Sequence, residues 1–298
     1  MTYRSDAVGL VLARPARMLG VEPFFAELIA GIEEGLAGEE RSLLLHVVPD
    51  HRTEIAAYRR WAGGSMVEAV IVVNLIVDDP RPAVLLELGI PAVALGGSPT
   101  GMPLSNVWID DARAMRDAVD YLVGLGHTRL GRVSGPAELD HTRARSVAFD
   151  SESSRWRVQH ATAEGDYSEE SGRAATLSLL SRDEPPSAVV YDNDIMAMAG
   201  LAAAADVGVS VPGGLSLLAW DDSTLCRLSN PALSAMTLDV YAMGSQVAQA
   251  VLNMLAGGPI TAYMAPLPRL SARASTAAAS LAVPPAPAAL EVPPGPRF

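Results

Sequence analysis

Short apolar segments alternate with longer amphipathic segments along most of this 298-residue chain. Segments such as AVGLVLA (residues 7–13) and LSLLAW (residues 215–220) have the length and continuous apolar character of strands that are buried on both faces. In FFAELIAGIEEGL (residues 24–36), apolar residues instead recur at helical spacing. Strands that alternate with helices predict parallel sheets covered by helices on both faces.

The alternation runs through the chain twice. A single hydrophobic core stops growing at about 250–300 residues, so two successive series favour two lobes over one body. We therefore predict an α/β fold with two doubly wound parallel-sheet lobes and a cleft between them. The predicted strands cover residues 7–13, 43–48, 69–73, 92–95 and 107–109 in the first series, and 130–134, 158–163, 186–191 and 215–220 in the second.

The charge and cysteine content exclude several classes of function. Acidic residues number 34 against 22 basic ones, a net charge of −12, which repels phosphate and predicts poor binding of nucleic acid by this chain alone. A single cysteine, Cys226, excludes an internal disulfide and a cysteine-rich metal site. The five histidines have no metal-binding spacing, so we expect neither a metal nor a cofactor.

The longest apolar run, residues 69–77, is far shorter than the roughly 20 residues of a membrane span. The first residues have no signal-peptide pattern, and we expect a soluble cytoplasmic protein with no membrane partner. Residues 277–298, AAASLAVPPAPAALEVPPGPRF, are rich in Ala and Pro without periodicity, which predicts a disordered tail.

Polar residues follow several predicted strands. Ligands of open parallel sheets bind beyond the carboxyl ends of the strands. Carboxylates and amides at these ends suit a hydroxyl-rich ligand. The same residue types also cap the helix that follows a strand, so each is a candidate for either role. These positions hold Asp110–Asp111, Asp192–Asn193–Asp194 and Asp221–Asp222.

Six segments occur in an order and spacing that are together specific. They are PFFAELIAGIEEGL (23–36), YLVGLGHTRLG (121–131), EGDYSEESG (164–172), DNDIMAMAGL (192–201), VPGGLSLLAWDDS (211–223) and RASTA (273–277). Over residues 6–277 the chain resembles the effector-binding core of the lactose-repressor/galactose-repressor (LacI/GalR) family of bacterial transcription regulators.

The resemblance implies two lobes of the periplasmic-binding-protein type that are joined by three crossovers. The first would comprise residues 6–126 with 240–262, and the second residues 127–239 with 263–276. A sugar or similar small effector would bind between them. Family members usually carry a DNA-binding head and a hinge helix ahead of this core, which this chain lacks. A homodimer is implied, with operator DNA as a partner only through such a head.

The resemblance also implies a pocket. Arg145, in HTRARSVAF, would anchor ligand hydroxyls or a carboxylate, unless it forms a surface ion pair. Tyr167 would stack on the ligand, or simply pack at a strand end. Asn193 and Asp221 match the family's effector-binding amide and carboxylate, whereas Asp194 is expected to cap the next helix.

Phe24 and Phe25 stand where one family aromatic faces the cleft and the other belongs to the core. Asp110 matches part of an Asp-Asn pair at the end of the fifth strand. Three departures from the family stand out: Glu22 replaces an Asn, residues 150–163 lack a helical apolar run, and Leu238 occupies a position that is polar in some sugar-binding members. The last suggests a pocket less hydrophilic than a typical sugar site.

The resemblance implies that an effector shifts the arrangement of the lobes and thereby the affinity for DNA. One alternative is a transport-type solute-binding protein, which would need an export signal, and another is a headless sensor that does not touch DNA. An enzyme is disfavoured, because the sequence has no G-x-S-x-G motif, no phosphate-binding loop and no histidine beside a nucleophile.

Overall fold

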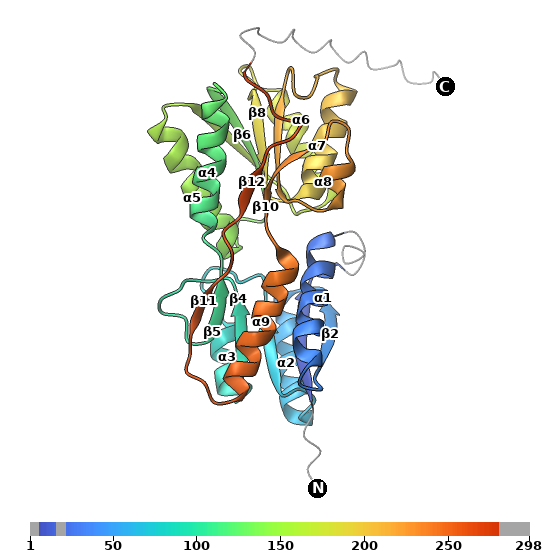
Figure 1. Cartoon of the computed structure of the whole chain (residues 1–298), viewed down its shortest axis with the longest axis vertical. Coiled ribbons are helices and arrows are strands. Elements are labelled where there is room, and N and C mark those ends of the chain that lie inside the picture. Colours follow the sequence, from blue (N-terminus) through green and yellow to red (C-terminus); the bar gives the residue numbers. More distant parts are fainter. Residues whose placement is uncertain (1–5, 16–21, 280–298) are drawn as a thin grey trace, which may run out of the picture.

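The computed structural model describes residues 6–15 and 22–279. Figure 1 shows two lobes stacked along the long axis, each with one sheet between helices. Both sheets have six strands and are dominated by parallel pairs. The structure thus confirms the predicted α/β fold with two parallel-sheet lobes.

The first sheet has the strand order β11-β5-β4-β3-β1-β2, and all its pairs are parallel. Its two central strands, β3 and β4, are apolar and buried along their whole length, as the sequence predicts for strands covered on both faces. The strands are β1 (Ala7–Ala13), β2 (Ser42–Val48), β3 (Ala69–Val72), β4 (Ala92–Leu95), β5 (Ser105–Trp108) and β11 (Ala262–Met264).

One face of this sheet is covered by α1 (Pro23–Ala37) and α9 (Val240–Leu255), and the other by α2 (His51–Gly64) and α3 (Arg81–Glu87). Helices α1 and α9 lie in close contact. A side chain at Gly31 or Gly244 would collide with the backbone of the opposite helix, so glycine at both positions allows this approach.

The second sheet has the order β12-β10-β9-β8-β6-β7, with β12 antiparallel to β10. Its strands are β6 (Arg129–Ser134), β7 (Gln159–Glu164), β8 (Ala188–Tyr191), β9 (Ser216–Asp221), β10 (Ser234–Thr237) and β12 (Arg269–Ser271). Its helices are α4 (Asp111–Gly124) and α5 (Asp140–Arg155) on one face, α6 (Glu169–Leu180) and α7 (Asp194–Asp206) on the other, and the short α8 (Thr224–Leu228).

Helix α4 lies in a different lobe from the one we predicted. The sequence placed residues 6–126 together, but the buried side chains of α4, such as Met115 and Leu122, share a core with Phe149 and Leu218 of the second lobe. Apolar periodicity identifies a helix but not the sheet that it covers. The chain therefore crosses between the lobes before α4, not after it.

Helix α5 extends to Arg155, although its sequence has no apolar helical period. The reason is that its buried face is largely polar and includes Thr142, Arg145, Glu152 and Ser153 beside Phe149. A search for apolar stripes therefore misses its second half.

The first residues of the predicted Ala/Pro-rich tail, 277–279, are part of the fold rather than disordered. The backbone NH of Ala279 donates to the carbonyl of Leu125, and His127 bonds the carbonyl of Ala277, so these residues belong to the second lobe. Residues 280–298, the rest of the predicted tail, lie outside the described residues.

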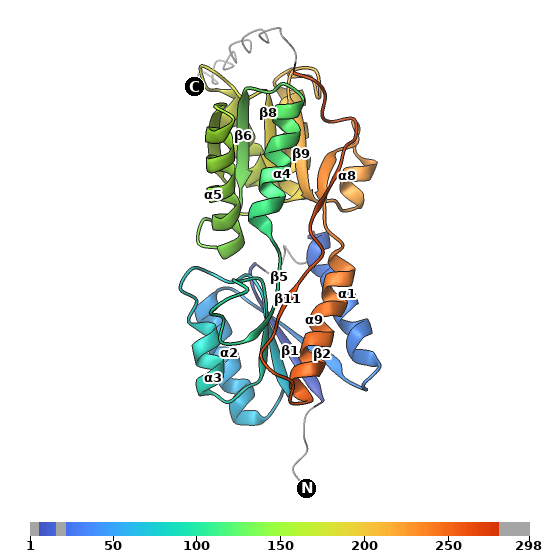
Figure 2. The ribbon, with the colours of Figure 1, turned by 60° about the vertical axis from the view of Figure 1, so that its left-hand side comes forward.

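Three crossovers join the lobes, between β5 and α4, β10 and α9, and β11 and β12 (Figure 2). Backbone hydrogen bonds also span the cleft. The NH of Asp140 donates to the carbonyl of Leu75 (2.9 Å), and the NH of Val77 donates to the carbonyl of Glu138 (3.0 Å). The start of α5 is thereby held against the loop that follows β3.

Candidate functional site

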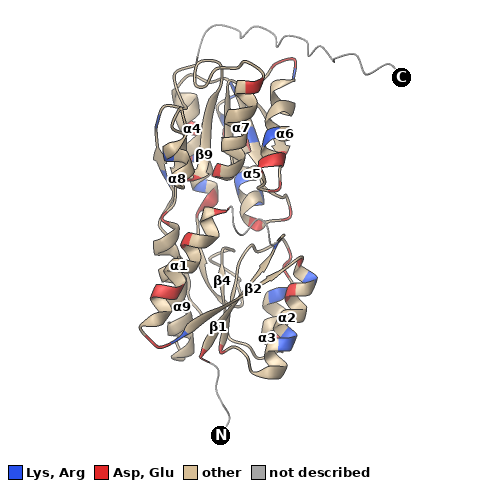
Figure 3. Cartoon of the chain, turned by 90° about the vertical axis from the view of Figure 1, so that its right-hand side faces the viewer, with Lys and Arg blue, Asp and Glu red and all other residues tan. Residues whose placement is uncertain are grey.

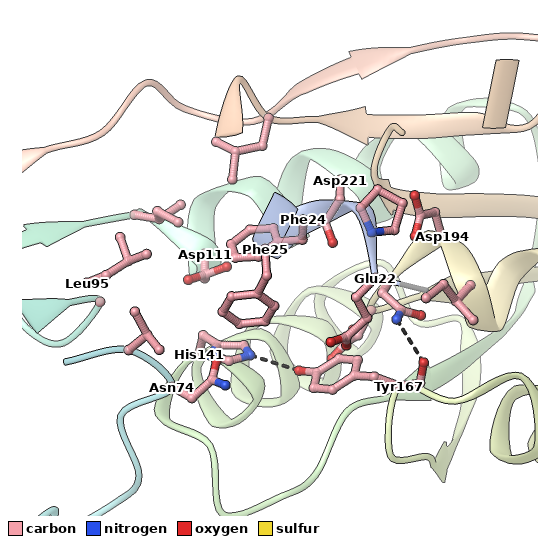
Figure 4. Close-up of a pocket in the computed structure, with 18 of the residues that line it drawn as sticks. Glu22, Phe24, Phe25, Asn74, Leu95, Asp111, His141, Tyr167, Asp194 and Asp221 are labelled. Atoms are coloured by element: carbon pink, nitrogen blue, oxygen red, sulfur yellow. Dashed lines mark hydrogen bonds between the residues drawn. The ribbon is translucent and has the colours of Figure 1, made fainter. Parts of the chain in front are cut away.

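A cavity of about 100 Å³ lies between the two lobes. Segments that follow the carboxyl ends of strands in both sheets line this cavity, and parallel sheets bind their ligands at these ends. Figure 4 shows the side chains that converge on it. The residues predicted as ligand contacts that line it are Phe24, Phe25, Arg145, Tyr167, Asn193 and Asp221.

Arg145 is held in the cavity wall by the protein itself. Its Nε donates to Oδ1 of Asp111 (2.7 Å), its Nη1 donates to the carbonyl of Asp192 (3.2 Å), and its guanidinium lies 4.2 Å from the centre of the Trp220 ring. Burial opposes its charge, but Asp111 and Asp192 outweigh burial and raise its pKa. The predicted alternative, a surface ion pair with Asp140 or Asp150, does not form.

Asp111, rather than the predicted Asp110, faces this cavity. Asp110 is the N-cap of α4, where its Oδ1 accepts from the backbone NH of Arg113 (2.9 Å). Asp111 is the first residue of the helix and is only 7% exposed. The sequence left capping and ligand binding open for both residues. At this cavity, Asp110 caps the helix and Asp111 lines the wall.

Asp221 is the cavity carboxylate without a partner. No hydrogen bond or ion pair engages its side chain within the described residues, whereas Asp222 pairs with Arg273 (2.7 Å) and accepts from Thr237 (2.8 Å). Both aspartates have left-handed backbones, with φ of 76° and 64°, which turns the two carboxylates in different directions at the end of β9. Such backbone strain often occurs at functional sites.

The surroundings of Asp221 disfavour its charge. Burial, followed by repulsion from Asp194, raises the pKa of Asp221 to about 8. Figure 4 shows the two carboxyl groups near each other at one end of the cavity. A ligand that donates hydrogen bonds to Asp221 would supply what the protein does not.

Asn193 combines a structural role with its place in the cavity wall. Its Oδ1 accepts from the NH of Met196 (2.9 Å), which makes it the N-cap of α7, and its Nδ2 donates to the carbonyl of Tyr167 (3.1 Å). We expected Asp194 to be the cap. Asp194 instead accepts from the NH of Ser223 (3.3 Å) and so ties α7 to the segment after β9.

Tyr167 lies across the cavity from the phenylalanines. Its hydroxyl is within hydrogen-bonding distance of His141 Nε2 (2.8 Å) and Thr142 Oγ1 (3.2 Å), and its ring stacks on His141. A side chain at Gly135 would overlap the tyrosine ring, so glycine is required there. Burial, followed by the nearby charge of Arg145, lowers the pKa of His141 to about 3, which keeps the imidazole neutral.

Phe24 and Phe25 both line the cavity, and their rings meet edge to face with centroids 5.1 Å apart. Phe25 is also buried in the core of the first lobe, and the guanidinium of Arg14 lies 4.1 Å from its ring centre. Arg14 forms an ion pair with Glu22. The departure at Glu22 therefore supplies a partner for this arginine.

Three polar lining residues, Arg14, Asn74 and His141, were absent from our candidates. Asp111, Asp192 and Asp194 were among the strand-end candidates but not in the predicted ligand set. Arg14 and Asn74 come shortly after β1 and β3, so a stricter use of the strand-end rule would have found them. Asn74 carries a further signal, because it follows β3 and adopts the left-handed backbone (φ 50°) that asparagine tolerates.

Beneath the cavity, Asp192 forms a fully buried pair with Arg132. The Arg132 Nε–Asp192 Oδ1 distance is 2.9 Å and the Nη2–Oδ2 distance is 2.6 Å. Burial opposes ionisation, but Arg132 and Arg145 outweigh it and lower the pKa of Asp192. Asp192 is thus an ionised acceptor that is already occupied.

Two negative findings concern the described part of the chain. Within residues 6–15 and 22–279, no group of three His, Cys, Asp or Glu side chains is arranged to hold a metal ion. Over the same ranges, no helix has the length and apolar character needed to cross a bilayer.

This fold and cleft define the periplasmic-binding-protein class. Residues 119–276 match the family model described as a periplasmic binding protein-like domain. The chain is 30% identical over 269 residues to the transcriptional regulator CelR of Thermobifida fusca, covering 86% of this chain and 77% of CelR.

Solved structures agree with this assignment. A LacI-family transcriptional regulator from Bifidobacterium animalis is 32% identical, with a TM-score of 0.85 that covers 93% of this chain and all of that one. A CelR–cellobiose complex is 26% identical, with a TM-score of 0.84 over 91% of this chain and 85% of that one. The chain belongs to the LacI family of transcriptional regulators, as the sequence motifs suggested.

Proposed function

We propose that this protein senses an uncharged sugar in the cavity between its lobes and adjusts transcription in response. One observation carries the proposal: Arg145, which is held in place by Asp111, and Asp221, which has no partner among the described residues, line the same cavity. Arg145 retains donors to offer to oxygen atoms, and Asp221 accepts from hydroxyls. Together they supply a donor and an acceptor for adjacent hydroxyl groups of the ligand.

The apolar lining fits the same class of ligand. Phe24, Phe25 and Tyr167 offer ring faces and edges to the C–H surface of a pyranose. A relative of known structure is described as a complex with cellobiose, which supports a carbohydrate effector here. Leu238 lines the cavity too, in line with a pocket less hydrophilic than a typical sugar site.

The charge balance favours a ligand without an anionic group. Both arginines that line the cavity have carboxylate partners, Arg14 with Glu22 and Arg145 with Asp111. Asp194 remains in excess, and Asp221, whose pKa is raised to about 8, adds negative charge only above that pH. A phosphate or carboxylate on the ligand would therefore meet net negative charge, which costs affinity.

The cavity is proposed to bind its ligand without transforming it. His141, a conceivable base, is neutral and bonded to Tyr167 and lies beside no serine or cysteine nucleophile among the described lining residues. An effector that contacts both lobes would favour the closed arrangement, in which Asp140 and Val77 bridge the cleft. Such differential binding is the source of allosteric coupling, typically about 1–3 kcal/mol.

A homodimer is proposed as the unit that reads operator DNA through a head outside this chain, because operator half-sites are related by two-fold symmetry. Helix α7 is a better candidate for the dimer interface than α2. A groove beside α7 is lined by apolar side chains that include Met198 and Leu201. The exposed face of α2 instead carries Arg52, Arg59 and Arg60, visible as a blue group in Figure 3.

A thermal-shift screen tests the proposed function. The panel holds monosaccharides, disaccharides, nucleosides and polyols, with sugar phosphates and sugar acids as charged counterparts. We expect an uncharged sugar to raise the melting temperature, since a ligand at about 100 times its Kd stabilises by about 2.7 kcal/mol. The proposal fails if only anionic compounds or nucleosides stabilise the protein, or if the stabilising sugar binds equally well to the Arg145→Ala and Asp221→Asn variants.

A further inference from the structure

A second cavity, of about 260 Å³, adjoins the first. Side chains from both lobes and from the crossover before α4 enclose it. Five residues line both cavities, and these are Leu95, Gly96, Ile109, Asp111 and His141. The two spaces are therefore neighbouring parts of one interlobe cleft.

Size suggests that the two cavities serve one ligand. Small-molecule pockets usually have volumes of about 300–1,000 Å³. The first cavity, at about 100 Å³, and the second, at about 260 Å³, each fall below this range, whereas their combined volume reaches it. A ligand with two linked rings would use both.

The lining of the second cavity suits a second sugar ring. Trp108, the last residue of β5, is half-buried, and its indole makes no hydrogen bond or ring contact within the described residues. A flat indole face matches the C–H face of a pyranose, and its NH can donate to a hydroxyl. Asp140 also lines this cavity, and no described residue engages its carboxylate.

Asp110 belongs to this second cavity rather than to the first. Its Oδ1 caps α4, and its Oδ2 has no protein donor within the described residues. Two acceptor carboxylates, Asp110 and Asp140, thus line the same cavity as the indole of Trp108. The same combination of aromatic face and hydroxyl acceptors recurs in the first cavity.

We propose that the second cavity is a subsite for the second ring of a disaccharide, with Trp108 as the residue on which that ring stacks. This rests on the proposed function, because it assumes that the first cavity binds a sugar. The hydrogen bond from the NH of Asp140 to the carbonyl of Leu75 joins two residues that line the subsite. The subsite is therefore complete only when the lobes are closed, so a second ring adds affinity by favouring closure.

Calorimetric titration with three probes tests the subsite: glucose as a single ring, and cellobiose and maltose as two linked glucose rings. The proteins are the unaltered chain, Trp108→Ala, and Trp156→Ala as a matched control. Trp156 lies at the end of α5, away from both cavities, and is 46% exposed. We expect at least one disaccharide to bind ten times or more tighter than glucose.

In Trp108→Ala we expect that advantage to fall at least fivefold while glucose affinity stays within twofold, and in Trp156→Ala we expect no change. Unchanged glucose binding also shows that the Trp108 variant is folded. The subsite is overturned if glucose binds as tightly as both disaccharides, if no disaccharide binds, or if Trp108→Ala retains the advantage. The proposed function fails separately, when no uncharged sugar of the wider screen binds.

Discussion

The two lobes line the same cavity with side chains of different chemical character. The first lobe contributes mainly apolar surface, with Phe24, Phe25, Val73 and Leu95. The second lobe contributes most of the ionisable and hydrogen-bonding groups, namely Asp111, His141, Arg145, Tyr167, Asp192, Asn193, Asp194 and Asp221. We infer that the second lobe orients and selects the ligand, while the first covers it and excludes water.

The buried charges of the two lobes follow the same division. In the first lobe, Arg81 pairs with Glu54 and Asp79 at 1% exposure, but none of the three lines the cavity. In the second lobe, the buried pair of Arg132 with Asp192 lies directly under the cavity, and Arg145 with Asp111 is part of its wall. Apart from Arg14 with Glu22, which also line the cavity, buried charge in the first lobe supports the fold, whereas in the second lobe it supports both fold and site.

The largest expected effect is that of Arg145→Ala. It leaves Asp111 buried without its partner, and breaking such a pair costs about 3–5 kcal/mol of unfolding free energy. It also removes the donors that face the ligand, so binding should become undetectable. Urea denaturation and calorimetry measure the two losses. Arg143→Ala, an exposed arginine on the same helix, is the control and should change neither.

The next effect is that of Asp221→Asn, which keeps the shape of the side chain. The amide replaces an acceptor oxygen by a donor, so ligand hydroxyls that donate to Asp221 lose their partner, and sugar binding should weaken by about 1–3 kcal/mol, or about 5- to 150-fold. If the second lobe does not select the ligand, this variant will bind as tightly as the unaltered chain in calorimetry.

The same variant has a pH signature. The folded state holds a proton on Asp221 up to about pH 8, whereas the unfolded chain releases it near the ordinary aspartate pKa of 3.8. The folded state therefore binds more protons between these values, and its unfolding free energy falls as pH rises. Between pH 6 and 9 the unaltered protein should lose more unfolding free energy than Asp221→Asn. Urea denaturation at each pH measures these losses. Equal losses in the two proteins would contradict the buried, unpaired state of this carboxyl group.

Tyr167→Phe should have a smaller effect. It removes the hydroxyl that meets His141 and Thr142 but keeps the ring, and a net loss of about 1 kcal/mol in unfolding free energy is expected. Sugar affinity should fall less than tenfold if the ring provides the contact. A loss as large as that of Asp221→Asn would show that the hydroxyl itself binds the ligand.

The smallest expected effect is that of Phe24→Leu in the first lobe. Replacing one apolar surface by another should cost at most about 1 kcal/mol of binding, since aromatic contacts add about 0.5–1.5 kcal/mol beyond burial. The ranking of sugar epimers should not change, because hydrogen bonds from the second lobe decide it. A changed ranking in competitive titrations would break the comparison between the lobes.

Much of the fold could be predicted because each buried strand is a short apolar run between turns, as in residues 7–13. Apolar pattern could not assign α4 to its sheet, since an amphipathic helix fits either one. It also missed the second half of α5, whose buried residues include Glu152 and Ser153. The guanidinium of Arg145 on the same helix is buried because it has a partner, Asp111, and partners distant in sequence cannot be read from periodicity.

The site was predictable to the level of the segment but not always of the residue. Which of two neighbouring polar residues caps the next helix depends on backbone direction, which composition does not reveal, and a cap can also line the cavity, as Asn193 does. Asp110 caps and Asp111 pairs with Arg145, while Asn193 caps in place of Asp194. At the end of β9, Asp221 and Asp222 both have left-handed backbones. Asp221 lines the cavity, whereas Asp222 pairs with Arg273.

The crossovers have a consequence for how the molecule is made. Helix α9 and strand β11, which complete the first lobe, come after nearly all of the second in the chain. On a ribosome, the first five strands must therefore wait for about 130 further residues before the face of their sheet that contacts α9 is covered. The second lobe lacks only the short β12 once α9 has been made, so we expect the two lobes to complete their folding at almost the same time. We also expect a chaperone to bind the exposed sheet of the first lobe during synthesis.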